Sequence, residues 1–319
     1  MQSYDVIIIG AGPIGLACAV EAQKNNLSYL ILEKGRLVNS IYGYPVYMRF
    51  FSTSDLLEIG GIPFITQGEK PSRYEALEYY RRVADTFQFN LRAFETVTGV
   101  DGEDGNFFVK TETREYNARK VIAAIGYFDR PRMLDVPGEE LPKVSHYYQE
   151  PHYYTNHNIL LVGSGNSAVE AALETHRHGA KVTMAVRGPQ LKPGVKYWIR
   201  PDMETRIAKG EIQGYFNTAI REIRPDSVIL QTKNEAPFEV PNDLVLALTG
   251  YRPDFQLLDN LGVELLEDEY NTPRHDPNTY ETNRKGLYLA GVVVGGLQTD
   301  KWFIENSRDH ARVIFDQLT

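Results

Sequence analysis

The ten residues GAGPIGLACA, from Gly10 to Ala19, decide the fold of this chain. They follow YDVIII, residues 4–9, an apolar run rich in β-branched side chains that is typical of a strand buried on both faces. After the last glycine the sequence continues as LACAVEAQKNN, which is rich in good helix formers. Strand, glycine turn and helix therefore come in the order of a βαβ unit whose turn can hold a phosphate.

The three glycines of this turn have separate roles. In the pattern G-x-G-x-x-G, Gly10 permits the tight turn, Gly12 lets the backbone approach a pyrophosphate, and Gly15 allows close contact between helix and strand. The helix N-terminus adds roughly half a positive charge that favours the anion. A second strand, SYLILEK, carries Glu33 near its end, where a carboxylate can accept hydrogen bonds from an adenosine ribose. We therefore predict that the first domain binds a dinucleotide.

A second glycine cradle lies far along the chain, in NILLVGSGNSAVEAAL. A strand over residues 158–162 leads into Gly163, Gly165 and Ala168, which form G-x-G-x-x-A at the start of another helix. Because a long segment separates the two cradles, we expect them in separate domains that bind separate nucleotides.

The residue after the next strand distinguishes the second cradle from the first. The strand KVTMAV is followed by Arg187, where the first unit has Glu33, and Lys192 and Lys196 come soon after. An arginine cannot accept a hydrogen bond from a ribose hydroxyl, but its guanidinium can bind a 2′-phosphate. The pattern predicts NADPH here, with an ordinary solvated arginine as the alternative. The first cradle, with its ribose carboxylate, is typical of FAD.

Composition restricts the partners and the compartment. The chain has 319 residues, which favours two domains, and a formal net charge of -8, which would not attract nucleic acid. Its single cysteine excludes an internal disulfide, a Cys-x-x-Cys pair and a multi-cysteine metal cluster, and suits a reducing compartment. The N-terminus does not resemble a signal peptide, and no apolar run approaches the ~18 residues of a membrane helix. We expect a cytoplasmic protein with no nucleic-acid or membrane partner.

Together these features resemble the two-dinucleotide-binding-domain flavoproteins of the thioredoxin reductase type, over nearly the whole chain. Three further stretches match motifs of that family: VIAAIGY (121–127), LALTGYRPD (246–254) and TNRKGLYLAGV (282–292). The resemblance implies an α/β fold with two Rossmann-like domains. The FAD-binding domain would comprise residues 1–126 and 243–319, and the inserted NADPH-binding domain residues 127–242. It also implies a homodimer.

Within that family the chain is similar to the bacillithiol disulfide reductase-like proteins. The similarity rests on SIYGYPVYMRFFSTSDLLEIGGIPF (40–64), KPSRYEALEYYR (70–81), YETN (280–283) and FIEN (303–306). It implies that hydride passes from NADPH to the flavin, and that the electrons then reduce a low-molecular-weight disulfide of bacillithiol type in redox homeostasis.

The resemblance also assigns cofactor-binding residues. For FAD these are Gly10, Gly12, Pro13, Ile14, Gly15, Glu33, Lys34, Gly126, Gly291 and Val292. For NADPH they are Gly163, Gly165, Asn166, Ser167, Ala168, Arg187 and Lys192. The stretch LQTDKWFIENS (297–307) is expected to start a helix, and the resemblance implies that the N-terminal amides of this helix, at residues 298–301, face the pyrimidine carbonyl of the flavin.

Three departures from the family bear on the chemistry. The Cys-x-x-Cys that thioredoxin reductases carry before the second cradle is replaced here by VSHYYQEPHYY (144–154). Ile14 stands where bacillithiol-type enzymes commonly carry a cysteine, and Val292 stands where the broader family offers an aspartate to the flavin ribityl chain. Cys18 lies one helical turn, ~5.4 Å, deeper than Ile14 among apolar neighbours, so we predict a buried and unreactive thiol.

The catalytic residues stay unassigned because the chemistry is centred on the flavin. His146, Tyr147 and Tyr148 are candidates, since they fall where thioredoxin reductases bring chemistry to the flavin. The alternative is that this tyrosine-rich stretch is a packed linker. His176 and His178 face different sides of a predicted helix, and we predict no metal site.

We therefore predict an FAD-dependent NADPH oxidoreductase that acts on a small disulfide. A ferredoxin- or flavodoxin-NADP reductase would also lack cysteines and would use a small electron-transfer protein as its partner. A flavin monooxygenase-like enzyme would share the second cradle. A regulator that binds FAD and NADP as a sensor, without turnover, is the non-enzymatic alternative.

Overall fold

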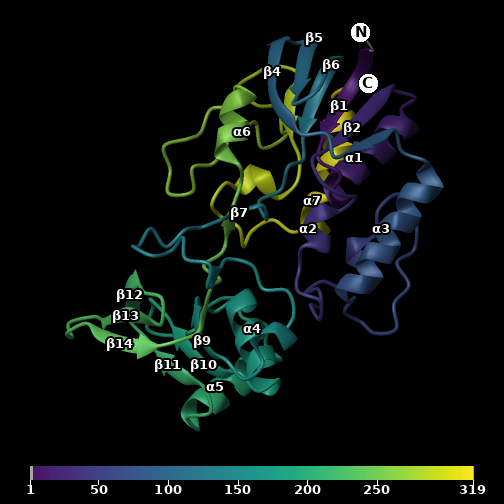
Figure 1. The fold of residues 1–319 in the computed structure, drawn as a ribbon. Coiled ribbons are helices and arrows are strands. Elements are labelled where there is room, and N and C mark those ends of the chain that lie inside the picture. Colours follow the sequence, from purple (N-terminus) through teal and green to yellow (C-terminus); the bar gives the residue numbers. More distant parts are fainter. Residues whose placement is uncertain (1–2, 319) are drawn as a thin grey trace. The chain divides into compact units, whose positions relative to one another are not determined.

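The structure, a computed structural model, describes residues 3–318 and divides the chain into two compact units (Figure 1). Unit 1 runs up to Arg130 and resumes at Tyr251, and unit 2 spans Pro131–Gly250. In Figure 1 unit 1 is purple and blue from the first part of the sequence and light green to yellow from its last part, which includes the light-green α6, whereas unit 2 is teal and green.

The two crossings between the units differ from the expected boundaries after residues 126 and 242. The return crossing falls eight residues later than expected, after Gly250, because β15 (Leu244–Ala247) pairs in parallel with β9 (Asn158–Val162) inside the sheet of unit 2. The outward crossing falls after Arg130, because Phe128 packs against Tyr44 within unit 1. The crossing segments β7 (Arg130–Pro131) and β16 (Tyr251–Arg252) pair with each other.

Unit 1 is built on one seven-stranded sheet. Its order is β3-β2-β1-β6-β5-β4, and β17 pairs with the second half of β6. The pairs that join β3, β2, β1, β6 and β17 are parallel, whereas β4, β5 and β6 form an antiparallel meander. The strands are β1 (Ser3–Ile9), β2 (Tyr29–Glu33), β3 (Leu91–Ala93), β4 (Val97–Glu103), β5 (Asn106–Thr111), β6 (Glu115–Ala123) and β17 (Leu287–Leu289).

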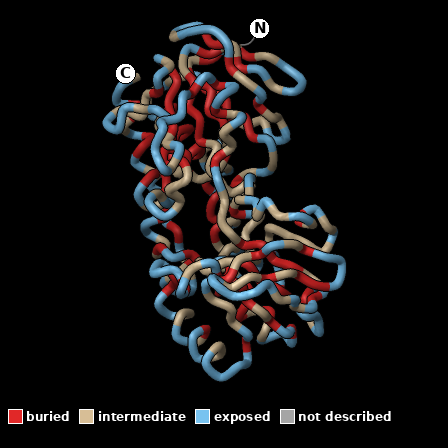
Figure 2. Tube along the Cα trace, turned by 90° about the vertical axis from the view of Figure 1, so that its left-hand side faces the viewer, coloured by how far each residue is buried: buried red, intermediate tan, exposed pale blue. Residues whose placement is uncertain are grey.

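Both faces of β1 are buried, as its continuous apolar sequence predicts. Val6 and Ile8 belong to a core cluster that includes residues of α1 and α3, and Ile7 and Ile9 belong to a second cluster on the other face. In Figure 2 red runs mark buried residues in the part of the tube near the N and C labels, which belongs to unit 1. The helices are α1 (Pro13–Lys24), α2 (Asn39–Tyr42), α3 (Arg73–Phe87), α6 (Phe255–Asn260), α7 (Ile304–Ser307) and α8 (His310–Phe315), with short 3₁₀ turns η1 (Asp55–Leu57) and η3 (Val292–Gly295).

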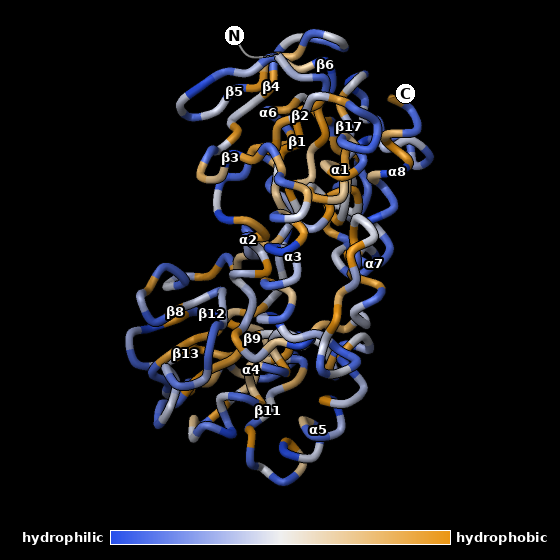
Figure 3. The backbone as a smooth tube through the Cα atoms, turned by 90° about the vertical axis from the view of Figure 1, so that its right-hand side faces the viewer, coloured by the Kyte–Doolittle hydropathy of each residue, from blue (hydrophilic) through white to orange (hydrophobic). Residues whose placement is uncertain are grey.

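Unit 2 repeats the same principle around a five-stranded parallel sheet. Its order is β11-β10-β9-β15-β8, and a three-stranded antiparallel sheet of order β12-β13-β14 accompanies it. The segment labelled β9 is orange, hence hydrophobic, in Figure 3. The remaining elements are β8 (Val144–Ser145), η2 (His152–Tyr154), α4 (Asn166–Arg177), β10 (Lys181–Ala185), α5 (Arg200–Ala208), β11 (Gln213–Tyr215), β12 (Thr218–Ile223), β13 (Ser227–Thr232) and β14 (Phe238–Pro241).

These bounds bear on two further properties of the helices. Across residues 3–318 no helix has both the length and the apolar character needed to cross a bilayer. The stretch 297–307 does start a helix, α7, but only at Ile304, so the expectation that residues 298–301 supply its N-terminal amides was wrong. The preceding segment forms turns instead, in which the Gln298 N–H donates to the Gly295 carbonyl oxygen and the Thr299 N–H donates to that of Leu297.

Candidate functional site

Two of the three glycines in the first cradle are required by the protein's own packing. Gly10 has a φ of +105°, and a Cβ there would lie 2.6 Å from the carbonyl oxygen of Ala124. A Cβ on Gly15 would lie 1.9 Å from the carbonyl oxygen of Gly10. Helix α1 therefore lies closer to β1 than it could if position 10 or position 15 carried a side chain, as the motif predicts.

Gly12 is different, because nothing in the protein requires it to be glycine. It caps the N-terminus of α1 with a φ of -72° and ψ of 175°, ordinary extended backbone, and a Cβ there would meet nothing within 4 Å. Pro13 follows as the first helical residue. The open face of Gly12 has the form expected for close approach of a pyrophosphate to the backbone.

A cavity of about 280 Å³ opens beside this turn, entirely within unit 1. This volume is close to the lower end of the range for small-molecule sites, roughly 300–1,000 Å³. Its lining combines the glycine turn with the end of β2, the start of β4 and helix α6. The lining includes Gly10, Gly12, Glu33, Lys34, Gly126, Asp129, Arg130 and Asp254.

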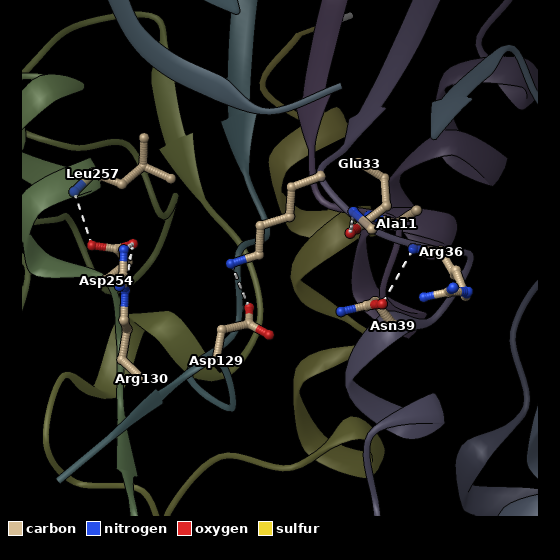
Figure 4. Close-up of polar contacts among 10 residues, drawn as sticks. Ala11, Glu33, Arg36, Asn39, Asp129, Arg130, Asp254 and Leu257 are labelled. Carbon is tan, nitrogen blue, oxygen red and sulfur yellow. Dashed lines mark hydrogen bonds and ion pairs between the residues drawn. The ribbon is translucent and has the colours of Figure 1, made fainter. Parts of the chain in front are cut away.

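Glu33 lies at the end of β2 with its carboxylate held beside the glycine turn (Figure 4). One carboxylate oxygen accepts from the Ala11 N–H at 2.8 Å and the other from the Gly35 N–H at 2.7 Å. Burial raises the pKa of Glu33, and these two backbone hydrogen bonds act against that shift. A carboxylate has about four acceptor positions, so acceptor capacity remains for two ribose hydroxyls.

Ion pairs line the part of the cavity away from the glycine turn. The Lys34 ammonium lies 2.8 Å from the Asp129 carboxylate, and the Arg130 guanidinium lies 2.8 Å from the Asp254 carboxylate. Asp254 also caps α6 by accepting the Leu257 N–H, at the left of Figure 4. The hydrogen bond from the Arg36 N–H to Asn39 lies at the right of the same view, near Glu33. Lys34 was predicted from the sequence, but its partner Asp129 was not, because the two are far apart along the chain.

The C-terminal segment of unit 1 meets the glycine turn at Ile14. Gly291 has a φ of +87°, and a Cβ there would lie 3.1 Å from the Ile14 side chain. Ile14 is itself buried, at 8% exposure. The isoleucine therefore fills a packed position against Gly291, directly before Val292 at the start of η3.

Cys18 is fully buried, which confirms the prediction of a structural thiol. Its exposure is 0%, and it belongs to the core cluster that contains Leu16, Ala19 and Ala22 of the same helix. Burial raises the pKa of the thiol far above its ordinary value, with the Glu21 charge as a smaller cause. A thiol in this state supplies almost no thiolate at neutral pH.

His310 is a residue of this region that the sequence did not reveal. It begins α8 with 1% exposure, and its Nδ1 accepts the Gly291 N–H at 3.2 Å. Burial, with His275 as a smaller cause, lowers its pKa to about 4. No motif distinguishes this histidine from the other six, because its role depends on a contact with a residue 19 positions earlier.

The second cradle repeats the geometry of the first. Gly163 has a φ of +142°, and a Cβ there would lie 2.4 Å from the Leu248 carbonyl oxygen. Gly165 caps α4 and, like Gly12, faces open space apart from a carbon of Lys192 at 3.9 Å. Ala168 is fully buried where the first cradle has its third glycine. Unit 2 therefore also presents a helix N-terminus with an uncrowded glycine.

The cationic residues near this cradle divide into two kinds. Arg187 and Lys192 are exposed, and neither forms a salt bridge with any residue of the 3–318 range. The Lys196 ammonium instead turns inward to the Glu170 carboxylate at 2.5 Å and is 5% exposed as a residue. Lys196, which follows Arg187 closely in the sequence, is thus a structural residue.

The loop that carries Lys192 is fastened to α4 by Asn166. The Asn166 side chain donates to the Gly194 carbonyl oxygen at 3.0 Å and accepts the Lys196 N–H at 2.8 Å. Asn166 thus holds the loop against α4 through two hydrogen bonds. Ser167 is exposed to solvent in the first turn of α4.

The three catalytic candidates, His146, Tyr147 and Tyr148, differ in how far they are buried in unit 2. Tyr148 is 3% exposed in the core, its hydroxyl donates to the Glu174 carboxylate at 2.7 Å, and burial raises its pKa. This position favours the packing alternative for Tyr148. His146 Nε2 lies 3.3 Å from the Glu139 carboxylate, and Tyr147 is half-buried.

Metal ligation has no support in the part of the chain that the structure describes. Within residues 3–318 no three His, Cys, Asp or Glu side chains gather as a metal site would require. His176 instead lies 3.7 Å from the Glu211 carboxylate.

A glycine cradle with a ribose carboxylate in one unit, and a glycine cradle with free cations in the other, define a two-nucleotide oxidoreductase. The family model for pyridine nucleotide-disulphide oxidoreductases matches residues 7–291, and the chain belongs to this family. Membership implies FAD and NADPH as cofactors, and the open glycines and the donor and acceptor groups of the two units fit them.

Named relatives match the chain along its full length. Bacilliredoxin reductase Bdr of Bacillus subtilis (strain 168) is 41% identical over 97% of this chain and 96% of its own length. The structure of bacillithiol disulfide reductase Bdr (YpdA) from Staphylococcus aureus has a TM-score of 0.96 at 38% identity and covers 99% of this chain and 98% of its own. That from Bacillus cereus has a TM-score of 0.96 at 40% identity and covers 99% of both chains.

The open face of Gly12 can be tested by filling it. Gly12→Ala should fold with a melting temperature within a few degrees of the parent, because the added methyl meets nothing, yet should bind FAD at least about tenfold more weakly. Titration of the apoprotein with FAD measures the effect. Gly68→Ala, another open glycine of unit 1, is the matched control. Equal FAD affinity in Gly12→Ala and the parent would contradict a pyrophosphate contact.

Arg187 provides a test of cofactor choice in unit 2. Arg187→Ala should raise the KM for NADPH by about 10- to 100-fold, as expected for a charge-assisted hydrogen bond, and leave the KM for NADH nearly unchanged. Steady-state kinetics with both cofactors makes the comparison, and Arg221→Ala on β12 is the control. An equal rise for both cofactors would rule out the 2′-phosphate contact.

His310 predicts a specific loss of stability in mild acid. Its folded pKa of about 4 lies below the unfolded value of 6.5, so its contribution is complete above pH 6.5 and is lost as the pH falls toward 4. At pH 5 this loss is about 2 kcal/mol relative to pH 7.5. Guanidinium unfolding of the parent and of His310→Asn at both pH values isolates it. A stability difference between the two proteins that does not change with pH would show that the buried ring titrates normally.

Proposed function

We propose that this chain is an NADPH-dependent flavoprotein that reduces a low-molecular-weight disulfide of the bacillithiol class. The observation that carries the proposal is similarity along the full length to enzymes whose names specify bacilliredoxin or bacillithiol disulfide. The two glycine cradles supply the sites that such an enzyme needs for its two nucleotides.

In this proposal unit 1 holds FAD and unit 2 holds NADPH. Gly12 and the N-terminus of α1 bind the FAD pyrophosphate, and Glu33 accepts hydrogen bonds from its adenosine ribose. Gly165 and α4 bind the NADPH pyrophosphate in the same way, and Arg187 with Lys192 binds the 2′-phosphate.

The reaction balances as NADPH, a proton and one disulfide giving NADP⁺ and two thiols. Bound FAD supplies the chemistry that takes hydride from NADPH and returns an electron pair to the disulfide. The chain's own residues bind and orient: the cradles fix the pyrophosphates, and Glu33 and Arg187 fix the ribose ends.

No thiol of the described chain can relay the electrons. Cys18 is the single cysteine, and it is sealed in the core with a raised pKa. Ile14, in the position of the family's cysteine, is packed against Gly291. The proposed reduction therefore proceeds without a protein disulfide. His146 and Tyr147 remain the candidate residues for the substrate in unit 2.

Two features of the cellular context complete the proposal. We place the enzyme in the cytoplasm, which a buried, reduced cysteine supports. We also propose a homodimer, on the resemblance to the thioredoxin reductase type.

The test is an anaerobic reaction followed by flavin absorbance. NADPH should reduce the bound flavin, and oxidised bacillithiol should then reoxidise it promptly with release of two thiols per disulfide. Cys18→Ala should react at the same rate as the parent, because the thiol is buried away from the chemistry. That variant is expected to be at most modestly less stable, because only the sulfur is lost from the core.

Other outcomes would identify other functions. If reduced flavin persists with the disulfide but is reoxidised by ferredoxin, the chain is a ferredoxin reductase. Oxygen uptake in proportion to an organic substrate would indicate a monooxygenase. If NADPH fails to reduce the flavin at all, the chain is a nucleotide sensor rather than an enzyme.

A further inference from the structure

His310 is a buried polar residue with only half of its hydrogen-bonding capacity used. Its Nδ1 accepts the Gly291 N–H at 3.2 Å, so in the neutral ring the proton is on Nε2. Nε2 is buried and has no hydrogen-bond partner among residues 3–318. A buried donor without a partner is unfavourable, and an apolar ring of similar shape would avoid that penalty.

Aromatic rings hold His310 in one orientation. Tyr280 stacks on it with ring centroids 3.9 Å apart and planes at 15°, and Trp302 meets it edge-on at 4.8 Å and 82°. His275 lies on Tyr280 at 6.1 Å, outside this contact. A half-turn of the ring about its Cβ–Cγ bond would put the carbon Cδ2 in place of Nδ1, and the rings of Tyr280 and Trp302 packed against it oppose that turn. The hydrogen bond to Gly291 is therefore the specific interaction that a histidine adds here.

The peptide N–H that donates this hydrogen bond to His310 belongs to Gly291, whose backbone is constrained from two sides. Gly291 has a φ of +87°, a conformation that side chains rarely adopt, and Ile14 of the glycine turn packs against its open side. Tyr280, which holds the His310 ring, also has a positive φ of 61°. The protein thus maintains two uncommon backbone conformations and one unpaired donor around a single peptide.

We propose that His310 is a positioning residue of the FAD site: its Nδ1 fixes the peptide of Gly291 and so sets the backbone of Gly291 and Val292 for the cofactor. The proposal rests on the assignment of FAD to unit 1. It also accounts for Val292, which has no carboxylate to offer the cofactor, because at this position the backbone geometry must then serve instead of a side chain.

Two substitutions separate the hydrogen bond from the packing. His310→Phe keeps a ring between Tyr280 and Trp302 but removes the acceptor, whereas His310→Asn removes the ring but places an amide oxygen where Nδ1 was. His275→Phe, on the outer side of the stack, is the matched control. FAD affinity is measured by titration of the apoprotein, and the environment of the bound flavin by visible circular dichroism.

We expect His310→Phe to bind FAD about tenfold more weakly with an altered flavin spectrum. Its apoprotein should melt within a few degrees of the parent, because loss of the unpaired Nε2 donor offsets the Gly291 N–H that is left without an acceptor. His310→Asn should recover FAD affinity to within about threefold, and His275→Phe should match the parent. If His310→Phe binds FAD as tightly as the parent, or if Asn and Phe weaken it equally, the positioning role is wrong.

Should His310→Phe fail to fold, His310→Gln takes its place, since its longer side chain carries the amide past the Nδ1 position. Weakened FAD binding in Gln together with recovery in Asn supports the proposal, and parent-like binding in Gln overturns it. Because the measurement is FAD binding, the result does not depend on which disulfide, if any, the enzyme reduces.

Discussion

The closest approach of α1 to β1 is the constraint on which the rest of unit 1 depends. A Cβ on Gly15 would lie 1.9 Å from the Gly10 carbonyl oxygen, so the helix can lie at this distance only if Gly15 has no side chain. The approach brings the N-terminus of α1 to the carboxyl ends of the parallel strands, beside the end of β2. It thereby places Gly12 and Glu33 at the same cavity, where a dinucleotide can be bound by both.

The same packing decides what Cys18 can do. The helix face that contacts β1 and α8 is made of small and branched apolar residues, and the thiol lies within that face. Its burial removes thiolate, so the electrons of the proposed reaction have no protein sulfur to pass through. Ile14 fills the remaining position near the turn by contact with Gly291. The isoleucine at position 14 and the buried thiol of Cys18 therefore agree with each other: neither position offers a reactive sulfur. Both agree with a reaction whose electrons are carried by the cofactors.

The sequence predicted much of the fold because its decisive elements are local. An apolar strand, a glycine turn and a helix are adjacent along the chain, and their periodicity and composition are visible without the structure. Predictions that depended on distant partners were less successful. The sequence prediction put the return of the chain to unit 1 after residue 242, whereas the structure has it after Gly250. The pairing of β15 with β9, which keeps residues 244–247 in unit 2, cannot be recognised from the composition of either segment. The helix N-terminus expected near residue 300 was wrong because turns that close on Gly295 and Leu297 occupy that stretch.

By itself, the sequence determined that this protein has two glycine cradles, one followed by a carboxylate and one by an arginine, and a single cysteine in an apolar helix. These features depend on residue type and short spacing along the chain, and the local geometry of strand, turn and helix is enough to bring such residues together at one site. Only the tertiary structure decided that Lys196 faces Glu170 and not the open cradle, that Tyr148 lies in the core, and that His310 reaches Gly291. The direction in which a long or ring-bearing side chain points is set by partners brought together through folding, and residue order does not specify them.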